Sequence, residues 1–120
     1  MEPTPYRWSD VSQDQPIAKL TRQRVFGEQM LLANVHLEKG CLVALHQHVS
    51  EQMAVILSGH VRWTLGKGEE QRLIEMRGGE AIHLPANCWH GVEALEDTQI
   101  IDILSPPGEM GVDRQSEAAH

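Results

Sequence analysis

The sequence predicts an all-β domain, a sandwich or jelly roll of about eight short strands. Two observations carry this prediction. Short stretches alternate apolar and polar residues, and glycine or proline separates them at short intervals. In addition, no segment of the 120 residues keeps the period of a helix.

The individual strands follow from this alternation, taken along the chain. Residues 31–37 place leucine, alanine and valine on one face, and a turn at 38–40 follows. Residues 53–57 are a continuous apolar run, which predicts a strand covered on both faces. Residues 61–65 alternate again, as a half-buried strand does. The other predicted strands are a run ending at His46, the segments 71–76 and 81–84, and a last strand at 99–104.

Length and composition predict a single globular domain. A chain of 120 residues with 41% apolar residues has the size of one ordinary domain, and it shows no linker or repeat. Within it we expect an N-terminal arm over residues 1–16, a β-barrel over 17–106 and a C-terminal tail over 107–120. Tyr6 and Trp8 could dock the arm onto its own barrel or onto a partner's.

Charge and cysteine content limit the choice of partners. A formal net charge of −7 disfavours a nucleic-acid partner, and no apolar run approaches the length of a membrane span. Cys41 and Cys88 are expected to be free thiols of a reduced cytoplasmic chain, small and buried, while a minor role as soft metal ligands stays open. We therefore expect a cytoplasmic protein that acts on a small molecule.

The placement of histidines is the strongest local signal for chemistry. His46 and His48 are two residues apart, so on a strand both side chains point to the same face and can bind one divalent ion. Gln52 follows four residues later, and His90 comes from a distant strand after a proline-containing loop. The remaining histidines are expected to be ordinary polar groups with no ligand role: His36, His60, His83 and His120.

Two motifs around these residues resemble those of the cupin family, with the family's spacing at every position. The first comprises Gly40, His46, His48, Gln52 and Gly59, and the second comprises Gly79, Pro85, Asn87, His90 and Ala94. The resemblance implies a cupin-type double-stranded β-helix, a jelly-roll barrel. It also implies one divalent metal ion, such as Ni, Zn, Mn or Fe, on His46, His48, Gln52 and His90. Cupins commonly form homodimers, often by exchanging N-terminal strands, and a homodimer is therefore expected here.

Three positions depart from the cupin pattern. Asn87 replaces a glycine, whose left-handed conformation asparagine tolerates, and Ala94 replaces an asparagine. Gln52 replaces a glutamate, and four neutral ligands would leave the full charge on the metal, making it a stronger Lewis acid. Glu51 could supply a carboxylate if the register shifted by one residue. The spacing to Gly59 favours Gln52, and adjacent strand residues face opposite ways.

Asp102 lies inside an apolar run of isoleucines and leucine, where a lone carboxylate costs stability unless it is hydrogen-bonded or paired. Such a carboxyl group can be a general acid or base with a raised pKa. It can equally be a structural aspartate that fastens the end of a strand. The sequence leaves both readings open.

A group of small cupins from pectin and alginate catabolism shares further features with this chain. They linearise 4,5-unsaturated uronates, and their first motif contains the Glu-Gln pair seen here at 51–52. Their C-terminal signature resembles residues 102–110. The resemblance implies ring opening and tautomerisation of a sugar acid by the metal, with Asp102 as the catalytic carboxylate. Leu104 and Gly108 stand where that group has an aromatic residue and an arginine.

The arginine is the natural partner of a uronate carboxylate. Arg22 or Arg62 could replace it, although the sequence does not show that either reaches the site. Two other functions stay open. One is an Fe(II) dioxygenase that keeps its iron with three histidines, and the other is a non-catalytic module that binds or senses a small molecule in the barrel.

Overall fold

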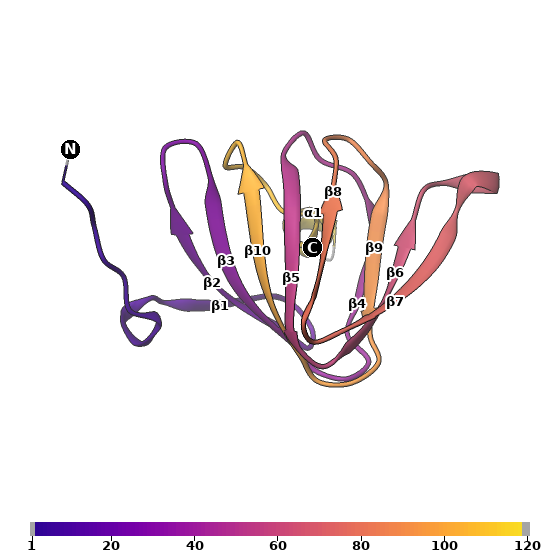
Figure 1. Ribbon diagram of the computed structural model, residues 1–120, viewed down its shortest axis with the longest axis horizontal. Helices are drawn as coiled ribbons and strands as arrows, with labels where there is room; N and C mark the ends of the chain where they lie inside the picture. Colours follow the sequence, from indigo (N-terminus) through magenta and orange to yellow (C-terminus); the bar gives the residue numbers. More distant parts are fainter. Residues whose placement is uncertain (1, 119–120) are drawn as a thin grey trace.

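The computed structural model describes residues 2–118, which form two antiparallel β-sheets facing each other (Figure 1). Within this range the chain has ten strands, two short 3-10 helices and one α-helix. The prediction of an all-β fold is therefore confirmed.

The larger sheet has six strands and contains both the N-terminal and the C-terminal strand of the chain. In spatial order they are β1 (Gln13–Ile17), β2 (Leu20–Phe26), β3 (Leu31–Leu37), β10 (Thr98–Ser105), β5 (Glu51–Ser58) and β8 (Glu80–Leu84). Strand β10 is inserted between β3 and β5, and it pairs with both along almost its whole length. Asp102 is thereby placed in the centre of this sheet, opposite Ala33 and Ala54.

The smaller sheet has four strands. In spatial order they are β4 (Leu42–His46), β9 (His90–Ala94), β6 (His60–Leu65) and β7 (Arg72–Arg77). The chain crosses between the sheets from β4 to β5 and again from β8 to β9, as in a jelly roll. The crossing from β4 to β5 consists of residues 47–50, and the crossing from β8 to β9 consists of residues 85–89. His48 lies on the former, and His46, Gln52 and His90 lie at the strand ends beside these two crossings.

The core lies between the two sheets, and the alternation seen in the sequence accounts for it. In β3 the four residues at alternate positions from Leu31 to Leu37 are buried, while those between them are only half-buried. In β6 Val61 and Trp63 point inward in the same way. This burial of one face of each sheet is the main source of hydrophobic stabilisation.

Strand β5 corrects one expectation. Its continuous apolar run predicted burial on both faces, but only the inner residues, Ala54 and Ile56, are fully buried. Met53 is 40% exposed and Leu57 is 54% exposed on the outer face. The prediction failed because an apolar run does not reveal whether the chain itself provides a second covering layer. Nothing in residues 2–118 packs over these two side chains to bury them.

Both terminal segments contain structure that the sequence did not predict. The expected arm includes a 3-10 helix at Trp8–Asp10 and strand β1, and Gln23 Nε2 binds the carbonyl oxygens of Trp8 and Val11. The other 3-10 helix is Gly68–Glu70. The expected C-terminal tail includes helix α1 (Gly111–Ala118), which packs on β1 and β4. Within the described range, no helix is long and apolar enough to span a bilayer.

The loop before β9 contains a residue in the left-handed conformation at the position where the second cupin motif has a glycine. Asn87 has a φ of 64°, and its backbone N–H donates to the carbonyl of His48 over 2.8 Å. Asparagine tolerates this conformation better than most residues. The substitution of glycine by asparagine therefore preserves the turn that leads to His90.

Candidate metal centre

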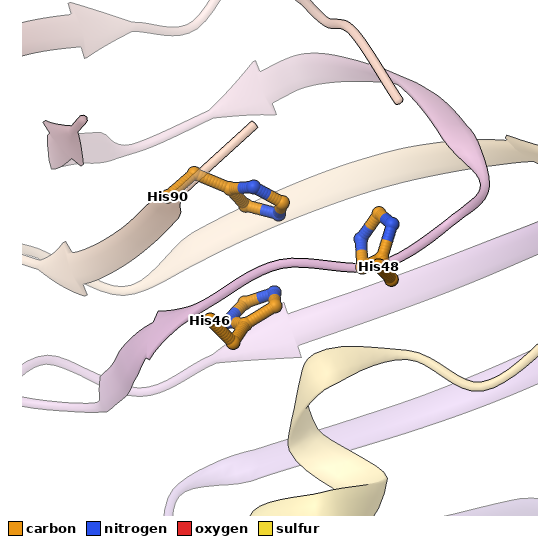
Figure 2. A group of neighbouring side chains, drawn as sticks. All are labelled: His46, His48 and His90. Carbon is orange, nitrogen blue, oxygen red and sulfur yellow. The ribbon is translucent and has the colours of Figure 1, made fainter. Parts of the chain in front are cut away.

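Three histidine side chains converge at one end of the barrel (Figure 2). His46 is the last residue of β4, His48 lies in the crossing that follows, and His90 begins β9 opposite His46. One ring nitrogen from each of the three lies within 4.8 Å of the others. The structure thus brings together the three histidines that the spacing of the sequence singled out.

The other ring nitrogen of each histidine is held by the backbone. The Nδ1 atoms of His46 and His48 each lie 2.8 Å from a carbonyl oxygen, that of Ala44 and Ser50 respectively. His90 Nδ1 lies 3.0 Å from the carbonyl oxygen of Cys88. Because a carbonyl can only accept, each Nδ1 carries the proton and each Nε2 of a neutral ring presents a lone pair.

Burial keeps at least two of these rings neutral at neutral pH. Desolvation lowers the pKa of His90 to about 4 and also lowers the pKa of His46. In His90, the neighbouring His46 adds to this effect. Metal ligands must be deprotonated at the binding atom, so these rings are ready to bind without first losing a proton.

Gln52 completes the cluster from the inner face of β5. Its Oε1 lies 3.1 Å from His48 Nε2, while its Nε2 donates to Asp102 Oδ1 over 2.8 Å. Oε1 and His48 Nε2 are both lone-pair atoms in this arrangement, and a cation between them satisfies both. His90 Nε2 is buried and has no hydrogen-bond partner among the described residues. The donor set therefore fits a divalent metal ion.

Glu51, the alternative ligand, points away from the cluster. Its carboxylate binds His83 Nε2 over 2.7 Å on the outer face of the sheet. The alternation of β5 causes this separation, because Gln52 faces the core and Glu51 does not. His36 and His60 are likewise bound elsewhere, to Gln99 and Glu75. His120 lies outside the described residues.

Asp102 is joined to the cluster through Gln52, and it is the only carboxylate that lines the adjoining cavity in the described part of the chain. It is 7% exposed, and its one side-chain hydrogen bond comes from Gln52. Burial raises its pKa to about 7, against the lowering effect of that hydrogen bond. A carboxyl group with such a pKa exchanges its proton near neutral pH.

The cluster borders a small cavity between the sheets. The cavity has a volume of about 50 Å³ and is lined by residues of both sheets and by the segment 110–112. Most of its lining is apolar, and neither lysine nor arginine contributes to it in the part of the chain that the structure describes. Trp63, which also lines the cavity, has an indole N–H without a partner in the same range.

The cysteines do not join the metal centre. Cys41 Sγ lies 3.7 Å from the carbonyl oxygen of Ala18, and Cys88 Sγ lies 3.8 Å from His90 Nδ1, the nitrogen that faces away from the cluster. Both are free thiols, and burial raises both pKa values. A thiol that stays protonated is a poor metal ligand.

The arginines considered as substrate partners are also engaged elsewhere. Arg22 is buried between Asp14 and Asp113, and Arg62 is paired with Glu93. The sequence analysis missed Arg114 on α1, which lines the surface grooves on both sides of residues 46–48 and donates a hydrogen bond to the carbonyl of Gln47. No periodic signal marked α1, because Val112 is its only large apolar residue.

Two facing antiparallel sheets with three histidines at one end define a jelly-roll barrel built to hold a metal ion. Residues 33–104, more than half of the chain, match the cupin domain family. The protein is a member of the cupin family, as its two motifs predicted.

Solved structures show the same fold. KdgF from Halomonas sp. superimposes with a TM-score of 0.79 and 22% identity, over 90% of this chain and 97% of that one. An RmlC-like cupin from Shewanella frigidimarina gives 0.78 and 18%, over 87% and 91%. Oxalate decarboxylase from Lactobacillus farciminis, in a formate complex, gives 0.77 and 18%, over 88% of this chain and 33% of that one. No curated protein sequence matches significantly.

Proposed function

We propose that this cupin is a metal-dependent enzyme that converts a sugar acid, such as a 4,5-unsaturated uronate, without electron transfer. His46, His48, Gln52 and His90 would hold one divalent ion. Asp102 would move the proton. The observation that carries the proposal is the hydrogen bond between Gln52 and Asp102, which places a carboxyl group with a pKa of about 7 beside the histidine cluster.

A divalent ion on four neutral ligands supplies, when bound, a Lewis acid that polarises a substrate oxygen. The protein's own contribution lies in Asp102. Its Oδ1 is held by Gln52, whereas Oδ2 makes no hydrogen bond to the described residues. Oδ2 is therefore the atom available to take up and return a proton during ring opening and tautomerisation. The apolar lining around it limits competing water.

Two likenesses support a sugar acid as the substrate. One is the sequence resemblance to the uronate-linearising cupins at residues 46–52 and 102–110. The other is the structural likeness to KdgF over nearly the whole of both chains. Arg114 supports an anionic substrate independently, because it is an exposed cation beside His46 and His48. Its guanidinium has further N–H groups besides the one on Nη2 that donates to the Gln47 carbonyl, and a carboxylate accepts hydrogen bonds from such groups.

The test begins with metal content. Protein purified without chelators or a metal-affinity column should carry about one divalent ion per chain, and His48→Ala should lose it. The loaded protein is then given unsaturated uronates, and the loss of their ultraviolet absorbance is followed. A chain that carries no metal and takes none up contradicts the proposal. Loaded protein that leaves the uronates unchanged contradicts the substrate but not the metal site.

One observation favours a second function. Among residues 2–118, the three imidazoles form a cluster that no carboxylate joins, and Gln52 is the further donor that lies against it. Such a set suits a dioxygenase that retains Fe(II) by histidines alone, although many iron oxygenases use two histidines and one carboxylate. Iron as the native metal, together with oxygen uptake, would favour this function over the non-redox reaction.

We also propose that the protein is a homodimer. Met53 and Leu57 are exposed on the outer face of β5, next to the half-buried Ile101 and Ile103 of β10. An apolar sheet face of this kind is typical of an interface between subunits. The molar mass in solution, measured by light scattering, tests this proposal.

A further inference from the structure

Helix α1 and the residues leading into it cover the metal centre. We propose that this segment, residues 107–118, is a lid that must move before a substrate reaches the metal. The proposal rests on the metal site described above and adds a moving part to it. Helix α1 contacts β1 of the larger sheet and β4 of the smaller sheet, and Figure 1 shows it behind β5 and β8. Figure 2 shows a helical turn below His46 and His48.

The lid touches a metal ligand directly. A Cβ atom built on Gly111 would lie 2.2 Å from both Nε2 and Cδ2 of His46, so the backbone of Gly111 rests against the side of the ring that carries the binding nitrogen. Only glycine leaves room for this contact. Met110 and Val112 on either side are buried in the core. The segment 110–112 therefore occupies space that a ligand of the metal would need.

The cavity between the sheets, which is the pocket that Asp102 lines, is too small for a sugar. The cavity at the cluster measures about 50 Å³. Binding pockets for small organic ligands usually measure about 300–1,000 Å³. Because Met110, Gly111 and Val112 all line the cavity, displacing this segment enlarges it on the side of His46.

One buried arginine latches the lid. Arg22 on β2 is 3% exposed, and its Nη2 donates to Asp113 Oδ1 over 2.5 Å while Nη1 donates to Oδ2 over 3.2 Å. Its Nη1 also lies 3.4 Å from Met110 Sδ. The same guanidinium binds Asp14 on β1 through Nε and Nη2. Arg22 thus has one carboxylate partner on the lid and one on the barrel.

A weaker set of contacts joins the lid to the strand that carries the ligands. The Gln115 amide binds both the N–H and the carbonyl of Ala44, over 3.3 and 3.4 Å. That carbonyl also accepts the Nδ1 proton of His46. Arg114 donates to the carbonyl of Gln47, three residues further along and between His46 and His48. The position of the lid is therefore linked to the orientation of His46.

Two hydrogen bonds hold the chain to the barrel just before the lid, and the moving segment begins after them. Ser105 Oγ donates to the carbonyl of Gln29 over 2.7 Å, and Ser50 Oγ donates to the carbonyl of Pro106 over 2.5 Å. After Pro106, the next hydrogen bonds to the barrel are those of Met110 and the helix. The residues between, from Pro107 to Glu109, are the place where the chain can bend.

The test compares two variants that each remove one carboxylate from Arg22. Asp113→Asn weakens the latch, and Asp14→Asn is the matched control, because Asp14 lies on the barrel. Two quantities are measured on the whole protein. One is the rate at which EDTA removes Co²⁺ from the loaded protein. The other is backbone hydrogen exchange over residues 110–115.

We expect Asp113→Asn to speed the loss of Co²⁺ by about tenfold, since hydrogen bonds to charged groups are among the stronger ones. Exchange over 110–115 should rise in parallel. Asp14→Asn should leave both within about twofold of the wild type, because the lid keeps its own bond to Arg22.

Two results would overturn the lid. One is an equal effect of both variants on the rate of Co²⁺ loss, and the other is exchange over 110–115 that does not change in Asp113→Asn. A wild-type protein that takes up no Co²⁺ would contradict the metal site instead. In that case the exchange measurement still decides whether Arg22 holds α1 in place.

Discussion

Gln52 links Asp102 to the metal centre: its amide donates to Asp102 Oδ1 over 2.8 Å, and its Oε1 faces His48 Nε2 over 3.1 Å. A glutamate at position 52 would place a second carboxylate against Asp102. Two carboxylates at that distance cannot both be ionised, so one would hold a proton. Glutamine at a position where cupins usually have glutamate is therefore what allows Asp102 to titrate on its own.

The substitution Gln52→Glu tests this relationship. We expect the variant to bind metal and to shift the acidic side of the dependence of kcat/KM on pH to higher pH. Asp102 must be ionised to take up the proton, and the added negative charge raises its pKa above about 7. The pH dependence of kcat/KM, measured on metal-loaded protein, gives the result. An unchanged profile would show that the two side chains are not coupled in the working enzyme.

Replacing the proton carrier separates catalysis from binding. Asp102→Asn should keep the metal and lower turnover by about 100-fold or more, the usual contribution of a general acid or base. Metal content and ligand binding are measured alongside activity. If the wild type binds small molecules without converting them, and the variant binds them equally well, the protein is a binding module rather than an enzyme.

Removal of the metal should destabilise the fold. A ligand that binds only the native state stabilises it by about 4 kcal/mol at a thousand times its dissociation constant. EDTA should therefore lower the Tm of the loaded wild type, and His48→Ala should show the low Tm without EDTA. His83→Ala is the control, because His83 pairs with Glu51 on the outer face. A Tm that EDTA does not change would argue against a bound ion.

The ion pair between Arg22 and Asp113 should lose its stabilising effect only at acidic pH. Burial alone would raise the pKa of Asp113, but the hydrogen bonds from Arg22 and the backbone of Met110 outweigh it and lower the pKa. The pair therefore stabilises the fold fully above the unfolded pKa of about 3.9 and loses this effect as the pH falls through the lower folded value. The difference in Tm between the wild type and Asp113→Asn should be constant from about pH 5 to about pH 7 and should shrink below about pH 4. A difference that already changes across the neutral range would exclude this pair as its cause.

The outer face of β5 should be the dimer contact. The double substitution Met53→Glu and Leu57→Glu puts charges on an apolar sheet face, so we expect it to convert a dimer into monomers. Leu73→Glu serves as the control, because Leu73 is also an exposed apolar residue but lies on β7 in the other sheet. Sedimentation velocity distinguishes the two states. A dimer that survives the double substitution but not Leu73→Glu would move the interface to the smaller sheet.

The parts of the molecule that the sequence predicted are those with a short repeat or a fixed spacing. The alternation in β3 and β6 identified the inner face, and the spacing of His46, His48 and His90 identified the cluster. The inner face depends on neighbouring residues of one strand, whereas His90 could be joined to His46 and His48 only through the spacing of the second motif. Asn87 was placed correctly because its left-handed turn is a local property.

The parts that the sequence did not predict depend on contacts between distant segments. Gly111 lies against His46 in a segment that Arg22, on the second strand, binds through Asp113. Helix α1 is too short and too polar to show a period of its own. Met53 was misplaced because the same apolar side chain suits a buried face and a surface that another subunit covers.

The three ligand rings are oriented by the carbonyls of Ala44, Ser50 and Cys88, and every residue type has a carbonyl. The side chains at positions 44, 50 and 88 contribute nothing to these three bonds. Mutations there can accumulate without altering the tautomers, as long as the backbone path is kept. Substitutions at these three positions therefore leave the orientation of the histidine rings unchanged. Related chains could differ in the residues of the lid, and so in substrate, while keeping the same histidines and Gln52.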